Sequence, residues 1–377
     1  MCLSSGGGRV NAMPDWDAIH WLYENGGPVI RLRTARELLP GGGAGEAGLA
    51  QALLQEPIVS HWLLSLDPGK VTPRTYHGSA DTCFENSISM LAQLGLGAGM
   101  DVLDEKTQPI RDWFSHAMQE DVSRRDVFAL ALFASLLAHI GYRDEAIMAF
   151  LRKRLCTLFG FVQKADYDLY DDPSLYKGIP TAFKGKPILR PSLYPGGDYQ
   201  FPLIYDLYGL AALSDGADAE TAKQISAVID YILAPEYHQK VAGGYGILAS
   251  PGGKYHAMGW DCKLPCYEGI GEDAQEKGPL LIQRALLLAC FPGAAGHPWL
   301  MGVLAHLESF ATGRGTYLFA RHYLKESLGY FVSGMHMSLG ENRRNKNALE
   351  LESTFYMLLL KKRAGLPQRQ PFIEKEA

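Results

Sequence analysis

The chain has 377 residues, of which 47% are hydrophobic and 20% charged, a balance that allows a globular protein to bury a sizeable core. Its net charge of -5 gives no electrostatic reason to expect nucleic acid or an anionic membrane as a partner, so we expect a small-molecule substrate. The six cysteines are too scattered for a disulfide framework and favour reduced thiols in the cytoplasm.

The two ends of the chain lack a helical pattern. The first residues, MCLSSGGGRVNAM, hold one arginine and no apolar stretch, which argues against a signal peptide. We expect a disordered leader over residues 1–14, with Met13 as an alternative start, a single domain over 15–366 and a polar tail over 367–377. The longest apolar run, Val127 to Ile140, is too short to span a bilayer.

Apolar residues recur at helical spacing through the first half of the chain. Two long helices there, joined by a short turn that contains Gly141, predict a helical hairpin. A helix that contains Phe84 and Ile88 is expected to be capped by Ser79 or Asp81 and closed by Gly95. The other expected elements are Asp15–Asn25, Pro28–Leu39, a linker at Pro40–Gly45, Gly48–Gln55, Pro57–Leu66, Pro109–Glu120, and the hairpin helices Asp126–Ile140 and Asp144–Phe159.

Two irregular segments, Phe161–Tyr199 and Val241–Gly278, interrupt the second half, and both are rich in Gly, Pro and Tyr. Strand signals are weak, with one possible short strand at Gly329–Met337. Paired helices without a strict repeat favour a closed ring, an all-α toroid whose pocket is roofed by the two irregular segments. The expected elements here are Pro202–Leu213, Ala217–Leu233, Gly278–Cys290, Pro298–Thr312, a segment around Tyr317–Leu328, and Asn347–Arg363.

Three short stretches carry a resemblance to a known group: GPVIRLRTARELL from Gly27, TCFENSISMLAQLGLGAGMDVL from Thr82, and LELESTFYMLLLKKRAG from Leu349. In these stretches the chain resembles bacterial squalene-cyclase-like proteins. The resemblance implies the α/α toroid of terpenoid cyclases and of protein prenyltransferase β subunits. The chain lacks the DxDD acid of the cyclases, and Asp261 and Cys262 are adjacent where the prenyltransferases have Asp-x-Cys. Neither activity therefore transfers directly.

A possible zinc site lies in the second irregular segment. His256, Asp261, Cys262 and Cys266 offer nitrogen, oxygen and sulfur ligands, and three residues separate the two cysteines. The alternative is that both cysteines are small buried apolar residues and that Asp261 makes hydrogen bonds in a turn.

A possible acid–base site lies at the start of one helix. Asp81 and Glu85 are four residues apart and share a helix face, and His77 lies just upstream. Two carboxylates beside a histidine suit general acid–base catalysis. The alternative is structural, with Asp81 as a helix cap and Glu85 favoured by the helix N-terminus. Asp198 and Asp261 are further candidates for the acid or base.

Aromatic and polar residues of the irregular segments are candidates for substrate binding, because aromatic faces shield cations or stack on sugar rings. For Asp206, on an otherwise apolar helix, a buried ion pair is the alternative. The candidates are Tyr194, Tyr199, Tyr205, Asp206, His256, Trp260 and Glu268.

Three functions fit these patterns. The first is an enzyme of squalene-cyclase-like ancestry that performs acid–base chemistry on a mostly apolar or cyclic small molecule in a central pocket. The second is a glycosidase or polysaccharide lyase on the same ring. The third is a binding protein that kept the ring and lost catalysis.

Overall fold

The computed structural model describes most of the chain. Its helices, with one small four-stranded sheet, confirm the mainly helical class. The predicted leader and polar tail, most of the predicted Pro40–Gly45 linker, and Trp260 lie outside the described residues. The described residues are 15–39, 45–72, 75–119, 126–250, 253–259, 261–271 and 274–366.

The helices of the first half follow the predicted order with two corrections. The helix predicted from Pro109 begins eight residues earlier, at Asp101, so this exposed proline lies inside it. The residue that caps the helix of Glu85 is Cys83, through its backbone, and not Ser79 or Asp81. The helices are α1 (Asp15–Asn25), α2 (Pro28–Arg33), η1 (Thr34–Leu38), α3 (Glu46–Leu53), α4 (Pro57–Ser65), α5 (Phe84–Gln93), α6 (Asp101–Ala117), α7 (Val127–His139) and α8 (Glu145–Val162).

The second half departs more from the expectation. The segment around Tyr317–Leu328 contains a single 3-10 turn, η10 (Arg321–Tyr323). The possible strand at Gly329–Met337 instead contains another such turn, η11 (Phe331–Ser333). An isolated bridge between Glu326 and His336 joins the chain on the two sides of this turn. The α-helices are α9 (Ile204–Ser214), α10 (Ala219–Leu233), α11 (Pro235–Lys240), α12 (Gly278–Leu288), α13 (Pro298–Glu308) and α14 (Ala348–Arg363).

The core is centred on α7. Its residues from Phe128 to Ala138 are all buried, because helices contact it on several sides. Its closest neighbour is α9, and Gly209 allows that approach. A Cβ at Gly209 would lie 2.6 Å from Leu151 and 2.7 Å from the Ser135 hydroxyl, so any larger residue would push α9 away from α7 and α8.

A set of helices pack on one another in succession: α5 on α7, α7 on α9, α9 on α12, α12 on α14 and α14 on α2. The residues that end three of them, Gln93, His139 and Arg363, line a common cavity of about 410 Å³. Glu85 and Tyr205 lie at the opposite, N-terminal ends of α5 and α9. These helices therefore run in the same direction with respect to the cavity.

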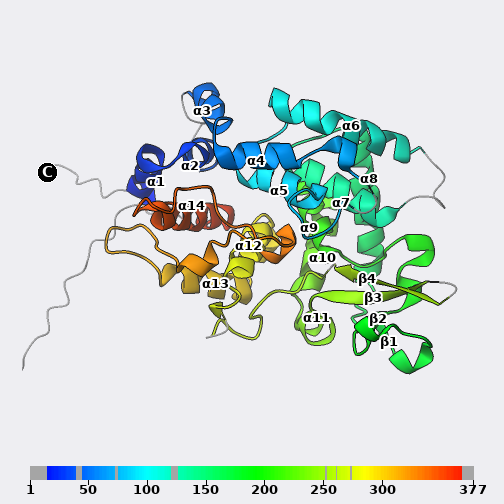
Figure 1. Cartoon of the computed structure of the whole chain (residues 1–377). Coiled ribbons are helices and arrows are strands. Elements are labelled where there is room, and N and C mark those ends of the chain that lie inside the picture. The colour runs from blue at the N-terminus through cyan, green and yellow to red at the C-terminus, as the bar shows by residue number, and fades with distance from the viewer. Residues whose placement is uncertain are drawn as a thin grey trace, which may run out of the picture.

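The two irregular segments meet in one sheet, a feature that the weak strand signals did not reveal. The first segment contributes β1 (Tyr170–Asp171) and β2 (Ile188–Leu189), and the second contributes the hairpin β3 (Tyr245–Ser250) and β4 (Lys254–Gly259). The parallel pairing of β2 with β3 joins the segments. Figure 1 shows the sheet at the opposite side of the molecule from α1, α2 and α14.

The sheet position corrects the expected roof. Neither irregular segment contributes a described residue to the 410 Å³ cavity, whose lining comes from helix ends and from the segment that contains η11. Among the described helices, none is long and apolar enough to cross a membrane.

Candidate functional site

The structure brings three predicted site residues together. The Nδ1 atom of His77 lies 2.6 Å from Oε2 of Glu85, and the hydroxyl of Tyr205 lies 3.1 Å from the same Nδ1. His77 precedes α5, Glu85 is the second residue of α5, and Tyr205 is the second residue of α9. A short contact between imidazole and carboxylate fixes the ring orientation and engages Nδ1, so Nε2 is the ring nitrogen outside this contact.

Burial assigns different roles to these groups. The side chain of Glu85 is 0% exposed, whereas that of His77 is 23% exposed. The second carboxylate oxygen of Glu85, Oε1, has no hydrogen-bond partner among the described residues. Burial, the charge of Glu85 and a hydrogen bond to it raise the pKa of Tyr205 well above its ordinary value, so Tyr205 stays protonated. Of these three groups, His77 is therefore the one with exposed side-chain surface, and Glu85 contacts it from the buried side.

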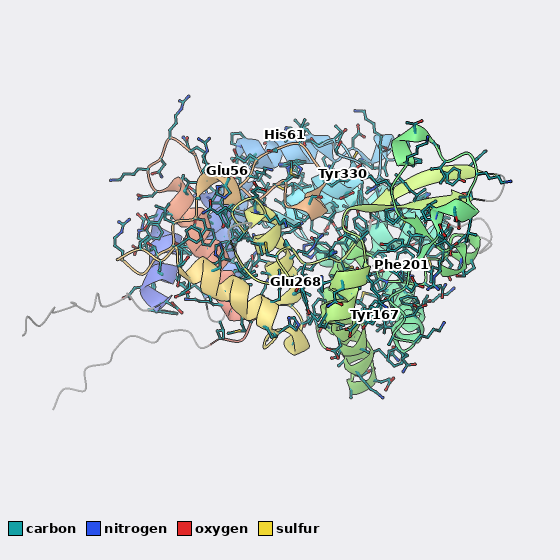
Figure 2. The ribbon with its side chains drawn as sticks, turned by 90° about the horizontal axis from the view of Figure 1, so that it is seen from below. Glu56, His61, Tyr167, Phe201, Glu268 and Tyr330 are labelled. Atoms are coloured by element: carbon teal, nitrogen blue, oxygen red, sulfur yellow. The ribbon has the colours of Figure 1, made fainter. Side chains whose placement is uncertain are left out.

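Aromatic rings surround the imidazole. The ring centroids of Phe128 and Tyr330 lie 5.3 Å and 5.1 Å from that of His77, and the Tyr205 ring lies at 6.0 Å. Phe128 is the second residue of α7, so α5, α7 and α9 all begin at this site. Tyr330, which precedes η11, is 40% exposed and forms the outer side. In Figure 2, Tyr330 lies well inside the outline of the molecule.

Two of the other three predicted carboxylates of the acid–base set, Asp81 and Asp198, do not join Glu85. Asp81 pairs with His61 at 2.9 Å, on the exposed side of the chain, and does not join Glu85. Asp198 ends the turn η7 (Pro195–Gly197) and is half-buried there, bonded to the chain through its own backbone. The carboxylate pair expected from the spacing of Asp81 and Glu85 is thus not formed, because His61 takes Asp81.

Three predicted binding residues have structural roles. Asp206 forms a buried two-point ion pair with Arg154, at 2.9 Å and 2.8 Å. The hydroxyl of Tyr194 bonds to the backbone of Ala249 in β3. The carbonyl oxygen of Tyr199 accepts from Arg154. For Asp206 the structural alternative is the one that the geometry supports.

The predicted zinc ligands are not assembled. His256 lies exposed on β4, and Asp261 accepts from the backbone N–H groups of Gly244 and Lys263. Cys262 is fully buried, and burial raises the pKa of its thiol, which disfavours the thiolate that a metal needs. In the part of the chain that the structure describes, no group of three or more His, Cys, Asp or Glu is placed to hold a metal.

The second irregular segment lines a hollow of about 620 Å³. Asp261, Cys266 and Glu268 are among its lining residues. Burial raises the pKa of Asp261, and the nearby Arg284 opposes that rise. Cys266 has a left-handed backbone, φ 54°, which is strained for a residue with a Cβ. Ser333 of η11 also lines the hollow, whereas Tyr330, three residues earlier in the chain, contacts the ring of His77 and does not line it.

A buried histidine of this hollow predicts a pH-dependent stability. Burial lowers the pKa of His238 to about 4, below the ordinary value of about 6.5. Because the unfolded chain then binds the extra proton, the free energy of unfolding should fall by up to about 3 kcal/mol between pH 6.5 and 4. Urea unfolding at both pH values measures this loss. His238→Gln should reduce it.

His256→Gln, on exposed β4, is the matched control and should leave the loss unchanged. The pKa values of His139, His297, His306 and His336 are lowered as well, so a residual loss remains in every variant. An equal loss in His238→Gln and the unaltered chain would contradict the assignment.

No local pattern singles out Phe128 and Tyr330, because each looks like an ordinary core or loop residue and only the fold places them beside His77. Searches of protein-family models, of characterised proteins and of solved structures find no match to this chain.

Proposed function

We propose that the chain is an α/α toroid enzyme that moves protons on a mostly apolar or cyclic small molecule. The succession of contacts from α5 through α14 to α2 supports a ring. Arg33 of α2 donates to the carbonyl of Gln93 at the end of α5, which supports closure between the first and last members of that succession. The resemblance of the three stretches to squalene-cyclase-like proteins is consistent with such a ring.

The contact between His77 and Glu85 carries the functional proposal. With Nδ1–H donated to Glu85, Nε2 holds a free lone pair and can take a proton from a bound molecule. The buried carboxylate stabilises the imidazolium that forms, and Tyr205 holds the pair in position. The same imidazole returns the proton in the reverse step.

The rings of Phe128, Tyr205 and Tyr330 favour an apolar or cyclic substrate, since they present aromatic surface around the imidazole. The exposed ring of Tyr330 also suits stacking on a sugar, which is the observation in favour of the carbohydrate alternative. A hollow of about 620 Å³ elsewhere in the molecule, lined by Asp261 and Glu268, has the size of a small-molecule site, but His77 and its ring partners do not line it.

A ligand panel tests the proposal. Isoprenoid diphosphates and neutral cyclic terpenoids form one arm, and oligosaccharides the other, with the melting temperature as the readout. We expect a rise of several degrees with the isoprenoid arm. Tyr330→Ala should remove most of that rise, because it takes away the outer ring beside His77.

Leu328→Ala is the matched control, since Leu328 is exposed two residues before Tyr330 and its aliphatic side chain cannot stack on a ligand. A larger rise with oligosaccharides would favour the carbohydrate alternative. No rise with either arm, or a rise that Tyr330→Ala leaves intact, would reject the proposed site.

A further inference from the structure

The 410 Å³ cavity lies at the far end of the helices that carry the proposed catalytic group. Gln93 ends α5 and His139 ends α7, whereas Glu85 begins α5 and Phe128 begins α7. Tyr208, one turn after Tyr205 on α9, lines the cavity. The cavity is therefore a separate site, and its function does not depend on the proposed acid–base chemistry.

Positive charge dominates its lining, which contains four arginines and two carboxylates. Glu37 is shared, because it accepts from both Arg33 and Arg363. Arg36 pairs with Glu46, outside the cavity. In the described structure, the hydrogen bonds of Arg143 go from Nη1 to the carbonyls of Ala138 and Tyr142, without a carboxylate partner.

These arginines also satisfy carbonyls at helix C-termini, where partial negative charge gathers. Arg33 donates to Gln93, Arg143 to Ala138 and Arg363 to Leu286. A guanidinium has five N–H groups, and Arg143 uses only one of its nitrogens in this way. Exposed Arg143 can therefore still bind an anion in two-point geometry.

The inner wall combines a neutral imidazole with apolar surface. His139 is exposed to the cavity, and desolvation of its ring together with the charges of Arg363 and Arg33 lowers its pKa to about 4. Its ring meets that of Tyr208 edge-on at 4.9 Å. Phe331 and Met337 add buried apolar surface. The wall suits the uncharged body of a ligand whose charge faces the arginines.

We propose that this cavity binds a small organic oxyanion, with its carboxylate or phosphate on Arg143 and its apolar body against Tyr208 and Phe331. The volume falls within the range of small-molecule sites. Opposite charge at one end and aromatic surface at the other discriminate such an anion from a neutral molecule of the same shape.

Phenyl phosphate, benzoate and the neutral analogue benzyl alcohol test the proposal in the whole protein. At millimolar concentration, the two anions should raise the melting temperature by several degrees and benzyl alcohol should not. Arg143→Gln should reduce the rise to less than half, each variant being compared with its own ligand-free melting temperature. Arg152→Gln, exposed on α8 and outside the cavity, is the matched control and should keep the full rise.

A second measurement needs no altered arginine. A bound anion offsets the positive field, so saturating phenyl phosphate should raise the pKa of His139, followed by NMR of histidine-labelled protein and assigned with His139→Gln. Arg33, Glu37, Arg143 and Arg363 act electrostatically on this imidazole, and the other charged or titratable groups that line the cavity with it are Arg36, Tyr208, Asp215, Cys290 and Tyr356. The proposal would be overturned if benzyl alcohol raised the melting temperature as much as the anions do, or if Arg143→Gln kept the full rise. It would also be overturned if phenyl phosphate left the pKa of His139 unchanged.

Discussion

Asp206→Asn should destabilise the protein by about 3–5 kcal/mol, because it leaves the charge of Arg154 buried without its partner. The side chains of Arg154 and Asp206 are 4% and 1% exposed, and two hydrogen bonds join them. Asp206 also accepts from the backbone N–H of Leu203 at the start of α9, so the variant weakens that end of the helix too. Urea unfolding at pH 7 measures the change.

Two controls separate the buried charge from other effects. Glu46→Gln breaks the exposed pair with Arg36 and should cost less than about 1 kcal/mol. The double variant Arg154→Met with Asp206→Leu removes both charges and should recover part of the loss, because no buried charge is left unpaired although the Phe201 carbonyl and the Leu203 N–H lose their partners. If Asp206→Asn lowers the free energy of unfolding no more than Glu46→Gln does, the buried ion pair does not stabilise the fold as its geometry indicates.

Helical periodicity was enough to predict the mainly helical class and most of the helices, because each helix carries its own apolar pattern. The hairpin of α7 and α8 and the closing helix α14 were located to within a few residues. β1 and β2 were missed because they have only two residues each and form only by pairing across the chain, whereas the hairpin of β3 and β4 was missed because its segment, rich in Gly, Pro and Tyr, was interpreted as a loop. The start of α6 was missed because Pro109 is typical of a helix beginning but is tolerated on an exposed face.

For the site, local spacing was informative only over one or two helix turns. His77 and Glu85 are eight residues apart, so the sequence alone predicts that they lie close together. In the structure Nδ1 of His77 contacts Oε2 of Glu85. The spacing did not reveal that Asp81 pairs with His61, because His61 comes from α4, 20 residues earlier in the chain. Zinc was suggested by ligand types, which say nothing of whether a thiol is buried, as Cys262 is. Long-range packing decides those cases.

Glu85→Gln should lower the rate of proton transfer about 10²–10⁴-fold, a loss as large as that of His77→Gln. A glutamine amide can offer N–H to Nδ1, which turns the imidazole to the tautomer that carries its proton on Nε2 and removes the base. Uptake of solvent deuterium by the panel ligand that most raises the melting temperature measures the rate, with mass spectrometry as the readout.

Comparison with Asp81→Asn decides whether Glu85 works through His77. Both carboxylates lie within five residues on one stretch of chain, but Asp81 is bonded to His61 and Glu85 to His77. Asp81→Asn should therefore keep the rate within about twofold, since general acid–base assistance requires hydrogen-bond reach. Because buried Glu85 positions the base and does not touch the ligand, its replacement should lower kcat with little change in KM, whereas Tyr330→Ala should mainly raise KM. Equal losses in the Asp81 and Glu85 variants would instead assign the chemistry to the carboxylate pair that the sequence spacing first indicated.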